Sequence, residues 1–173
     1  MQIFVDGAPR EVADGSDGFG LFEDKGIIAL YVNEELKDLS HKLVAGDVVS
    51  GVHISSPDGL SILRHSTAHL MAQAVQEIFD PAKLGIGPPI KDGFYFDFDV
   101  EESFKPEDLK RIEKRMKELV GKSQRFVRRE VSDEEARELM KDEPYKLELI
   151  SLKSSDVGEG SAEVSAGQLS VYE

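Results

Sequence analysis

The chain has 173 residues, of which 40% are hydrophobic and none is cysteine. This length allows one ordinary domain or two small ones, and the apolar content is high enough for a packed core. The lack of cysteine excludes disulfides and thiolate chemistry in this sequence. No apolar run approaches the roughly 20 residues of a membrane-spanning helix, and residues 1–6 lack the pattern of a signal peptide. We therefore expect a soluble, cytoplasmic protein with no membrane partner.

The net charge of −13 is unevenly distributed along the chain. Between Lys105 and Arg129 there are ten basic and four acidic residues, which gives this stretch a net charge of +6. The acidic total disfavours non-specific binding to RNA, whereas the basic stretch could contact nucleic acid locally. The alternative is a solvated helix face with charge pairs four residues apart. The sequence alone leaves both interpretations open.

The first sixty residues predict short strands around one short helix. Residues 3–12 indicate a hairpin with an Asp-Gly turn at residues 6 and 7, and residues 18–26 predict a short helix ended by a glycine. A strand at 27–32, a polar turn at 33–35 and a last strand at 48–54 follow. This order predicts a small β-grasp domain. The turn-forming run Ser55-Ser56-Pro57-Asp58-Gly59 marks its boundary, so we expect domains at residues 1–60 and 61–173.

The second predicted domain mixes helices and strands, so the fold class is α+β. Residues 61–79 carry apolar side chains at helical spacing and end at Asp80-Pro81. After a glycine- and proline-rich loop at 83–93, the strand 94–99 alternates, which places Phe94, Phe96 and Phe98 on one face. An amphipathic helix at 106–121 follows. The remaining predictions are a strand at 126–131, a short helix opened by a capping box at Ser132, a strand at 147–150, a loop at 154–167 and a strand from Leu169.

His65 and His69 lie four residues apart on the predicted helix, so both side chains point the same way. That spacing suits two ligands of one metal ion or two imidazoles beside one substrate. For an isolated pair, two unrelated histidines on a half-exposed face are the favoured interpretation. Because a zinc site needs three or four ligands, we expect no complete metal site in this chain, and a partial one at His65 and His69 stays open.

Five sequence strings, taken in their order along the chain, favour a functional role for the two histidines. They are Arg64-His65-Ser66-Thr67-Ala68-His69-Leu70, Leu84-Gly85-Ile86-Gly87-Pro88-Pro89-Ile90, Asp92-Gly93-Phe94-Tyr95-Phe96-Asp97, Glu113-Lys114-Arg115-Met116 and Tyr145-Lys146-Leu147. In this order and at these distances they resemble the second amino-terminal domain of bacterial threonyl-tRNA synthetases. The first sixty residues resemble the TGS domain, the β-grasp module that precedes it. The resemblance covers essentially the whole chain and implies an amino-terminal fragment with the TGS domain and most of the editing domain.

In that family the second domain resembles the editing domain of alanyl-tRNA synthetases and hydrolyses serine wrongly attached to threonine tRNA. The parent enzyme charges this tRNA using ATP. Serine lacks only one methyl group of threonine, which gives about 1–3 kcal/mol of discrimination, so a second site is needed. The resemblance implies the acceptor end of threonine tRNA as the partner and a homodimer formed by other domains. It implies no cofactor here, with ATP, magnesium and zinc in the synthetic domain.

The resemblance also assigns site residues. His65, His69 and Lys146 match the family's catalytic side chains. We expect His65 and Lys146 to position or activate the water and His69 to shape the pocket; without the resemblance, Lys146 reads as a solvated lysine on an edge strand. The expected substrate-binding residues are Gly85, Gly87, Pro88, Tyr95, Phe96 and Asp97. Phe96 stands where the family has a tyrosine, so we expect it to pack against the sheet.

The family completes its editing site with a later Asp-x-Cys-Arg-Gly-Pro-His segment, which does not occur in these residues. We therefore expect this chain alone neither to charge tRNA nor to deacylate it efficiently. Two other classes of function stay open. One is a non-catalytic TGS-containing module that binds RNA or a partner through the basic stretch. The other is a free-standing trans-editing hydrolase.

Overall fold

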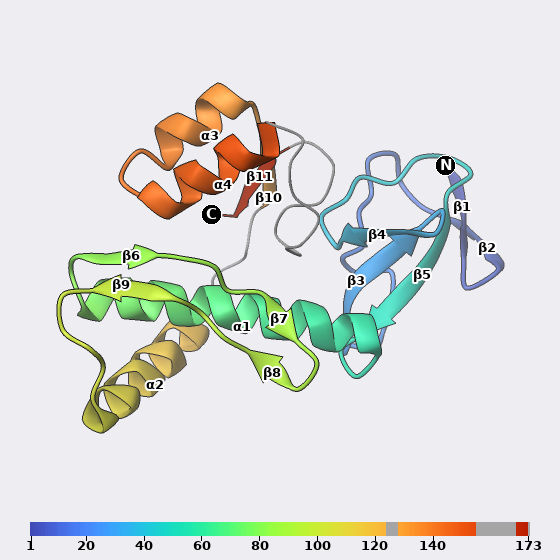
Figure 1. The fold of residues 1–173 in the computed structure, drawn as a ribbon. Helices are drawn as coiled ribbons and strands as arrows, with labels where there is room; N and C mark the ends of the chain where they lie inside the picture. The colour runs from blue at the N-terminus through green and yellow to red at the C-terminus, as the bar shows by residue number, and fades with distance from the viewer. Residues whose placement is uncertain (124–127, 155–168, 173) are drawn as a thin grey trace. The chain divides into compact units, whose positions relative to one another are not determined.

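The computed structural model describes residues 1–123, 128–154 and 169–172. The chain divides into two compact units, Met1–Leu63 and Arg64–Glu173. Each unit has its own sheet or sheets (Figure 1) and its own buried apolar residues. The two units are described separately below.

The first unit contains a five-stranded sheet with the strand order β2-β1-β5-β3-β4. Its strands are β1 (Gln2–Val5), β2 (Ala8–Glu11), β3 (Ile27–Val32), β4 (Glu35–Asp38) and β5 (Val48–His53). β1 pairs with β5 in parallel, and the other neighbours are antiparallel. Strand β4 was not predicted, because the residues after β3 were interpreted as a polar turn. The observed turn contains only residues 33 and 34, and Glu35 already pairs with Val32 in the sheet.

Two tight turns in this sheet are built from residues with positive φ. Asp6 and Gly7 have φ of 49° and 80° and join β1 to β2, which confirms the predicted hairpin. Asn33 and Glu34, with φ of 52° and 69°, join β3 to β4 in the same way. Both loops have two residues with positive φ, the geometry that matches the twist of antiparallel strands.

The predicted helix at residues 18–26 is wrong, because this segment forms turns and bends. The Gly18 N–H donates to the carbonyl of Leu39, 2.7 Å away, and Gly20 has a φ of 80°. A left-handed residue interrupts an α-helix. Leu21 is buried against Ile3 and Leu30 in the core of the unit, so tertiary packing determines the path of this segment.

The second unit contains three small sheets and the helices that cover them (Figure 1). Helix α1 (Pro57–Ile78) begins at the end of the first unit and continues into the second. The remaining elements are β6 (Ala82–Leu84), β7 (Pro89–Ile90), β8 (Gly93–Phe94), β9 (Phe98–Val100), α2 (Pro106–Gly121), β10 (Arg128–Val131), α3 (Asp133–Leu139), α4 (Pro144–Ser154) and β11 (Leu169–Tyr172). The antiparallel pairs are β6 with β9, β7 with β8, and β10 with β11.

Several predicted elements of this unit are confirmed and two are corrected. Helix α2 and the amino-terminal cap of α3 are as predicted, since the Ser132 hydroxyl accepts from the Glu135 N–H at 3.2 Å. The predicted strand at 94–99 is interrupted at residues 95–97, although its burial alternates as expected. The predicted strand at 147–150 is wrong, because these residues belong to α4. The predicted loop at 154–167 lies, except for its first residue, outside the described residues.

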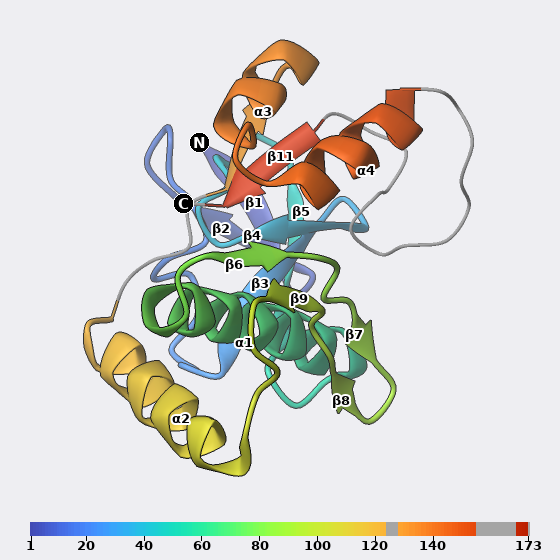
Figure 2. The same cartoon turned by 60° about the vertical axis from the view of Figure 1, so that its left-hand side comes forward.

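Two apolar clusters hold the second unit together. The larger one joins Ala74 and Val75 of α1 to Ala82 of β6 and to Ile112 and Leu119 of α2. Both ribbon views show β6 and β9 running along α1 (Figure 2). The smaller cluster joins β10, α3 and α4 through Val131, Ala136 and Ile150. Helix α1 thus provides the platform for the β6–β9 ribbon.

Candidate active site

The two predicted catalytic histidines contact each other directly on α1. The Nε2 atoms of His65 and His69 are 3.0 Å apart, and their ring planes meet at 87° with centroids 4.5 Å apart. At this distance one imidazole donates its Nε2–H to the Nε2 lone pair of the other. Which of the two rings donates depends on their tautomers.

A metal ion at this pair is an alternative that the sequence leaves open. A metal ion bound to both Nε2 atoms would need a lone pair from each, whereas the hydrogen bond uses one of the two nitrogens as a donor. Within the described parts of the chain, no group of three or more histidine, aspartate or glutamate side chains is arranged to hold a metal. The described residues therefore do not fit a zinc ion, which takes at least three protein ligands.

Lys146 and Phe96, fifty residues apart in the sequence, lie close together. The lysine is in the first turn of α4, and its Nζ is 5.8 Å from the centroid of the Phe96 ring. This is within the distance at which an ammonium is attracted to an aromatic face. Phe96 also stacks on Phe98, with centroids 4.9 Å apart. Phe96 is therefore packed within this unit, and Lys146 lies on a helix instead of the edge strand considered above.

The two predicted glycines allow the loop after β6 to approach the segment before β9. The Gly85 N–H donates to the carbonyl of Asp97 at 2.8 Å, and the Asp97 N–H donates to the carbonyl of Ile86 at 2.9 Å. A Cβ on Gly85 would lie 2.9 Å from the Cβ of Asp97, and one on Gly87 would lie 2.1 Å from the Phe96 ring. Packing alone thus requires glycine at both positions.

The other predicted substrate-binding residues are placed as follows. Pro88 is half-buried between β6 and β7, whereas Tyr95 and Asp97 are exposed between β8 and β9. The exposure of Tyr95 agrees with its predicted position on the face opposite Phe96. Substrate binding by these residues stays a prediction.

Glu143 is a residue that the sequence analysis missed. It precedes α4, and its carboxylate accepts from the Gln76 amide at 2.7 Å and from the Leu84 N–H at 2.9 Å. The available signal was an acidic residue followed by Pro144, because proline is favoured in the first helical turn. That signal indicates a helix start directly before Lys146.

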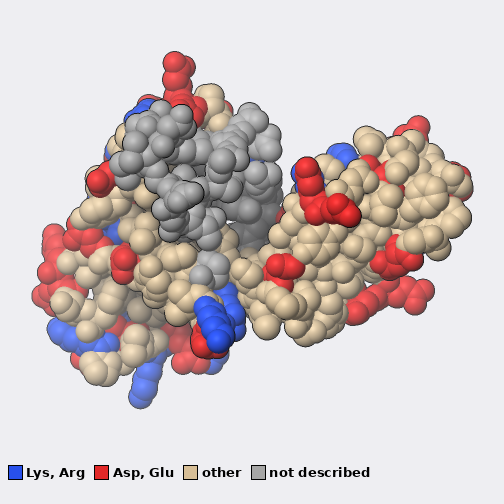
Figure 3. Space-filling model, turned by 45° about the vertical axis from the view of Figure 1, so that its right-hand side comes forward, with Lys and Arg blue, Asp and Glu red and all other residues tan. Residues whose placement is uncertain are grey.

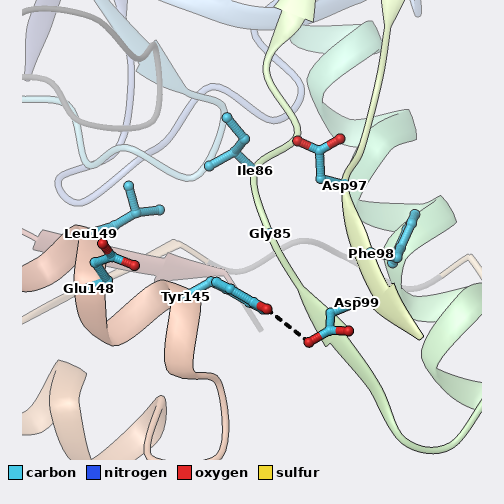
Figure 4. A pocket seen from close by; sticks show the side chains of 8 residues that line it. All are labelled: Gly85, Ile86, Asp97, Phe98, Asp99, Tyr145, Glu148 and Leu149. Carbon is cyan, nitrogen blue, oxygen red and sulfur yellow. Dashed lines mark hydrogen bonds between the residues drawn. The ribbon is translucent and has the colours of Figure 1, made fainter. Parts of the chain in front are cut away.

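A cavity of about 430 Å³ lies between α4 and the β6–β9 ribbon (Figure 4). Asp97, Asp99 and Glu148 contribute carboxylates to its lining, together with the Tyr145 ring and apolar side chains. The Tyr145 hydroxyl donates to Asp99 Oδ2 at 2.8 Å. This hydrogen bond, and then the charge of Asp99, raise the pKa of Tyr145 above its ordinary value of 10.0. The phenol therefore stays protonated and keeps this contact at neutral pH.

Several basic side chains between Lys105 and Arg129 form ion pairs where the structure describes them. On α2, Arg111 contacts Asp108 at 2.9 Å, and Lys117 contacts Glu113 at 2.6 Å. Arg115 contacts both Glu77 of α1 and Glu118. On the face drawn in Figure 3, scattered acidic side chains cover more of the surface than basic ones. Three of these acidic partners, Asp108, Glu113 and Glu118, are already counted in the net charge of +6. The pairs match the charge-paired helix face of one interpretation, and a local contact with nucleic acid stays open.

Comparisons with known proteins agree with the order of the sequence strings. No family model matches the chain. The chain is 55% identical to a threonine–tRNA ligase of Pseudarthrobacter chlorophenolicus, over 100% of the chain and 26% of that protein. It is 58% identical to that of Streptomyces coelicolor, over 95% of the chain and 25% of the relative. It is 54% identical to that of Thermobifida fusca, over 100% of the chain and 27% of the relative.

The chain spans about a quarter of the length of the curated relatives it matches. Among the described residues, no helix is both long enough and apolar enough to cross a membrane. The matched region spans the whole chain in two of these relatives. The chain therefore belongs to the threonine–tRNA ligase family, whose amino-terminal part it matches.

Proposed function

We propose that this chain forms the serine-editing part of a threonine–tRNA ligase. Its second unit, with the TGS-like unit before it, acts on the acceptor end of threonine tRNA and hydrolyses a wrongly attached serine. The observation that carries the proposal is the identity of 54–58% to threonine–tRNA ligases along the chain. The contact between His65 and His69 supports it, because it places two imidazoles at the same point of α1.

The reaction is the attack of water on the carbonyl carbon of the seryl ester. The water must lose a proton, the oxyanion must be stabilised, and the ribose oxygen must leave as a hydroxyl. If His65 accepts the proton, the geometry of the pair requires His65 to donate from Nε2 to His69. The proton from water then goes to Nδ1 of His65 and is returned to the ribose oxygen when the ester bond breaks. His69 fixes the tautomer and orientation of His65.

Lys146 supplies positive charge to this reaction. Its ammonium has three N–H donors, which can hold the attacking water or the developing oxyanion. The Phe96 ring, whose centroid is 5.8 Å from Nζ, contributes a cation–π contact to the position of this side chain. We assign ATP, magnesium and zinc to the synthetic reaction of the relatives, outside this chain, and no step proposed here uses them. A homodimer is likewise assigned to the remaining parts of these proteins.

The test uses the full-length enzyme with seryl-tRNA as the substrate. His65→Ala and Lys146→Ala should each lower the rate of deacylation by about 100-fold or more, as expected for the loss of a proton-transfer or charge-stabilising group. His41→Ala, the same substitution in the first unit, is the matched control and should leave the rate unchanged. Wild-type rates of seryl-tRNA deacylation in both active-site variants would exclude this function for the site.

A further inference from the structure

We propose that Glu143 is a positioning residue for Lys146, holding the start of α4 so that the lysine lies over Phe96. This inference rests on the proposed function, in which Lys146 acts on the aminoacyl ester. In that proposal Glu143 does not contact the substrate, and it acts only through Lys146. The argument starts from the three elements that Glu143 connects.

The two carboxylate oxygens of Glu143 bind different elements. Oε1 accepts from Nε2 of Gln76 on α1 at 2.7 Å, and Oε2 accepts from the backbone N–H of Leu84 on β6 at 2.9 Å. Glu143 itself is half-buried. Hydrogen bonds to an ionised acceptor are stronger than those between neutral groups, and partial burial strengthens them further. One side chain therefore fixes the start of α4 relative to both α1 and β6.

The backbone of the same residue supports Lys146. The carbonyl oxygen of Glu143 accepts from the Lys146 N–H at 3.1 Å and from the Leu147 N–H at 3.1 Å. These bonds form the first turn of α4. The position of the Lys146 backbone is thus determined by the residue whose carboxylate is bound to α1 and β6.

Two weaker contacts lie near those of the Glu143 carboxylate. The Lys83 ammonium donates to the carbonyl of Asp142 at 2.8 Å, and the Tyr145 hydroxyl donates to Asp99 at 2.8 Å. Both are exposed, and exposed polar contacts contribute less than partly buried ones. They hold the same end of α4 against β6 and β9. Glu143 is the member of this group that also makes a hydrogen bond to the Lys146 backbone.

The chemistry of the carboxylate predicts the effect of Glu143→Gln, in which one acceptor oxygen becomes an NH₂ donor. If the Gln76 amide turns over, its oxygen accepts from the new NH₂, and the bond from Gln76 to the carbonyl of Ala82, at 3.3 Å, is lost. If it does not, the NH₂ faces the Gln76 amide donor or the Leu84 N–H, and the bond from that donor is lost. In both cases one hydrogen bond and the charge of the carboxylate are removed.

The experiment measures kcat and KM for seryl-tRNA deacylation by the full-length enzyme. Glu143→Gln should lower kcat by about tenfold, the effect of one lost charge-assisted hydrogen bond, and leave KM nearly unchanged. Gln76→Leu should give a smaller fall in kcat and provides a second variant that keeps the carboxylate. In a Lys146→Ala background, Glu143→Gln should cause no further loss, because residues that act as a unit are not additive.

Glu77→Gln is the matched control. Glu77 also lies on α1 and also accepts from a glutamine amide, that of Gln73 at 3.1 Å, but its other partner is Arg115 of α2. This variant should lower the melting temperature and leave kcat unchanged. The inference is overturned if Glu77→Gln lowers kcat as much as Glu143→Gln, or if Glu143→Gln still lowers kcat in the Lys146→Ala background. Wild-type deacylation by Lys146→Ala alone would instead overturn the proposed function, and the inference with it.

Discussion

Replacing Gly87 with alanine tests how closely the loop after β6 packs on the Phe96 ring. The position of a Cβ on Gly87 is 2.1 Å from Cδ2, 2.5 Å from Cε2 and 2.8 Å from Cγ of Phe96. Carbon atoms prefer separations of about 3.5–4.0 Å, so the ring must retreat by roughly 1.5 Å. Because the ring also stacks on Phe98, this movement disturbs a second contact.

The expected cost follows from overpacking. Adding a methyl group to a well-packed site typically costs about 1–3 kcal/mol. For a unit of roughly 100 residues, 1 kcal/mol corresponds to about 4–8 °C in melting temperature. We therefore expect Gly87→Ala to lower the melting temperature of the second unit by at least about 4 °C. The displaced ring also changes its contact with Lys146, worth about 0.5–2 kcal/mol, so deacylation of seryl-tRNA should fall by about two- to thirtyfold.

Thermal unfolding followed by circular dichroism measures the first effect, and the deacylation rate of the full-length enzyme measures the second. Gly121→Ala is the matched control. Its added Cβ meets no atom within 4 Å, and the residue ends helix α2, so alanine should leave the melting temperature unchanged or raise it. Phe96→Leu supplies a background without the aromatic ring, in which Gly87→Ala should cost much less.

An unchanged melting temperature in Gly87→Ala would show that the ring moves without cost, which contradicts the packing argument. An equal loss in the wild-type and Phe96→Leu backgrounds would show that the loss arises at the backbone of residue 87. In either case the Phe96 ring could not be treated as a fixed surface for Lys146.

Three further predictions concern stability. Leu30→Ala removes a fully buried side chain of the first unit and should lower the free energy of unfolding in urea by about 2–5 kcal/mol. Ser132→Ala removes the acceptor of the Glu135 N–H and should cost about 1 kcal/mol in the same assay. The hydrogen bond from Arg115 holds the pKa of Glu77 below its ordinary 4.5. The ion pair therefore stabilises the folded state above pH 4.5, and this stabilisation is lost as the pH falls through the folded-state pKa of Glu77. The melting temperature should fall with pH in this range, and Glu77→Gln should remove this part of the fall.

Local patterns were sufficient to predict the elements whose own sequence determines them. Residues 27–32, which are rich in β-branched side chains, form β3, and the amphipathic residues 106–121 form α2 with the predicted bounds. The short apolar run at 147–150 failed because four residues show no period that separates a strand from a helix. Residues 18–26 failed because Leu21 is drawn into the core by Ile3 and Leu30, contacts that no local pattern contains.

In the candidate site, too, local contacts could be predicted from the sequence and distant contacts could not. The shared direction of His65 and His69 was predictable because both lie on one helix, four residues apart. The approach of Lys146 to Phe96 was not, because it depends on how α4 is held on the β6–β9 ribbon. The residue that holds it, Glu143, makes its side-chain contacts with Gln76 and Leu84, about sixty residues earlier in the chain. Such contacts leave no periodic signal in the sequence.

The phenylalanine at position 96, where the resemblance implies a tyrosine, can now be interpreted physically. The contact with Lys146 uses the face of the ring, 5.8 Å from the ammonium, and this face is common to phenylalanine and tyrosine. The close approach of Gly87 also involves only ring carbons. Phenylalanine therefore keeps the surface that directs Lys146 and removes only a hydroxyl group. In the proposed reaction, proton transfer then rests with His65 and His69, whose Nε2 atoms already share a hydrogen bond at 3.0 Å.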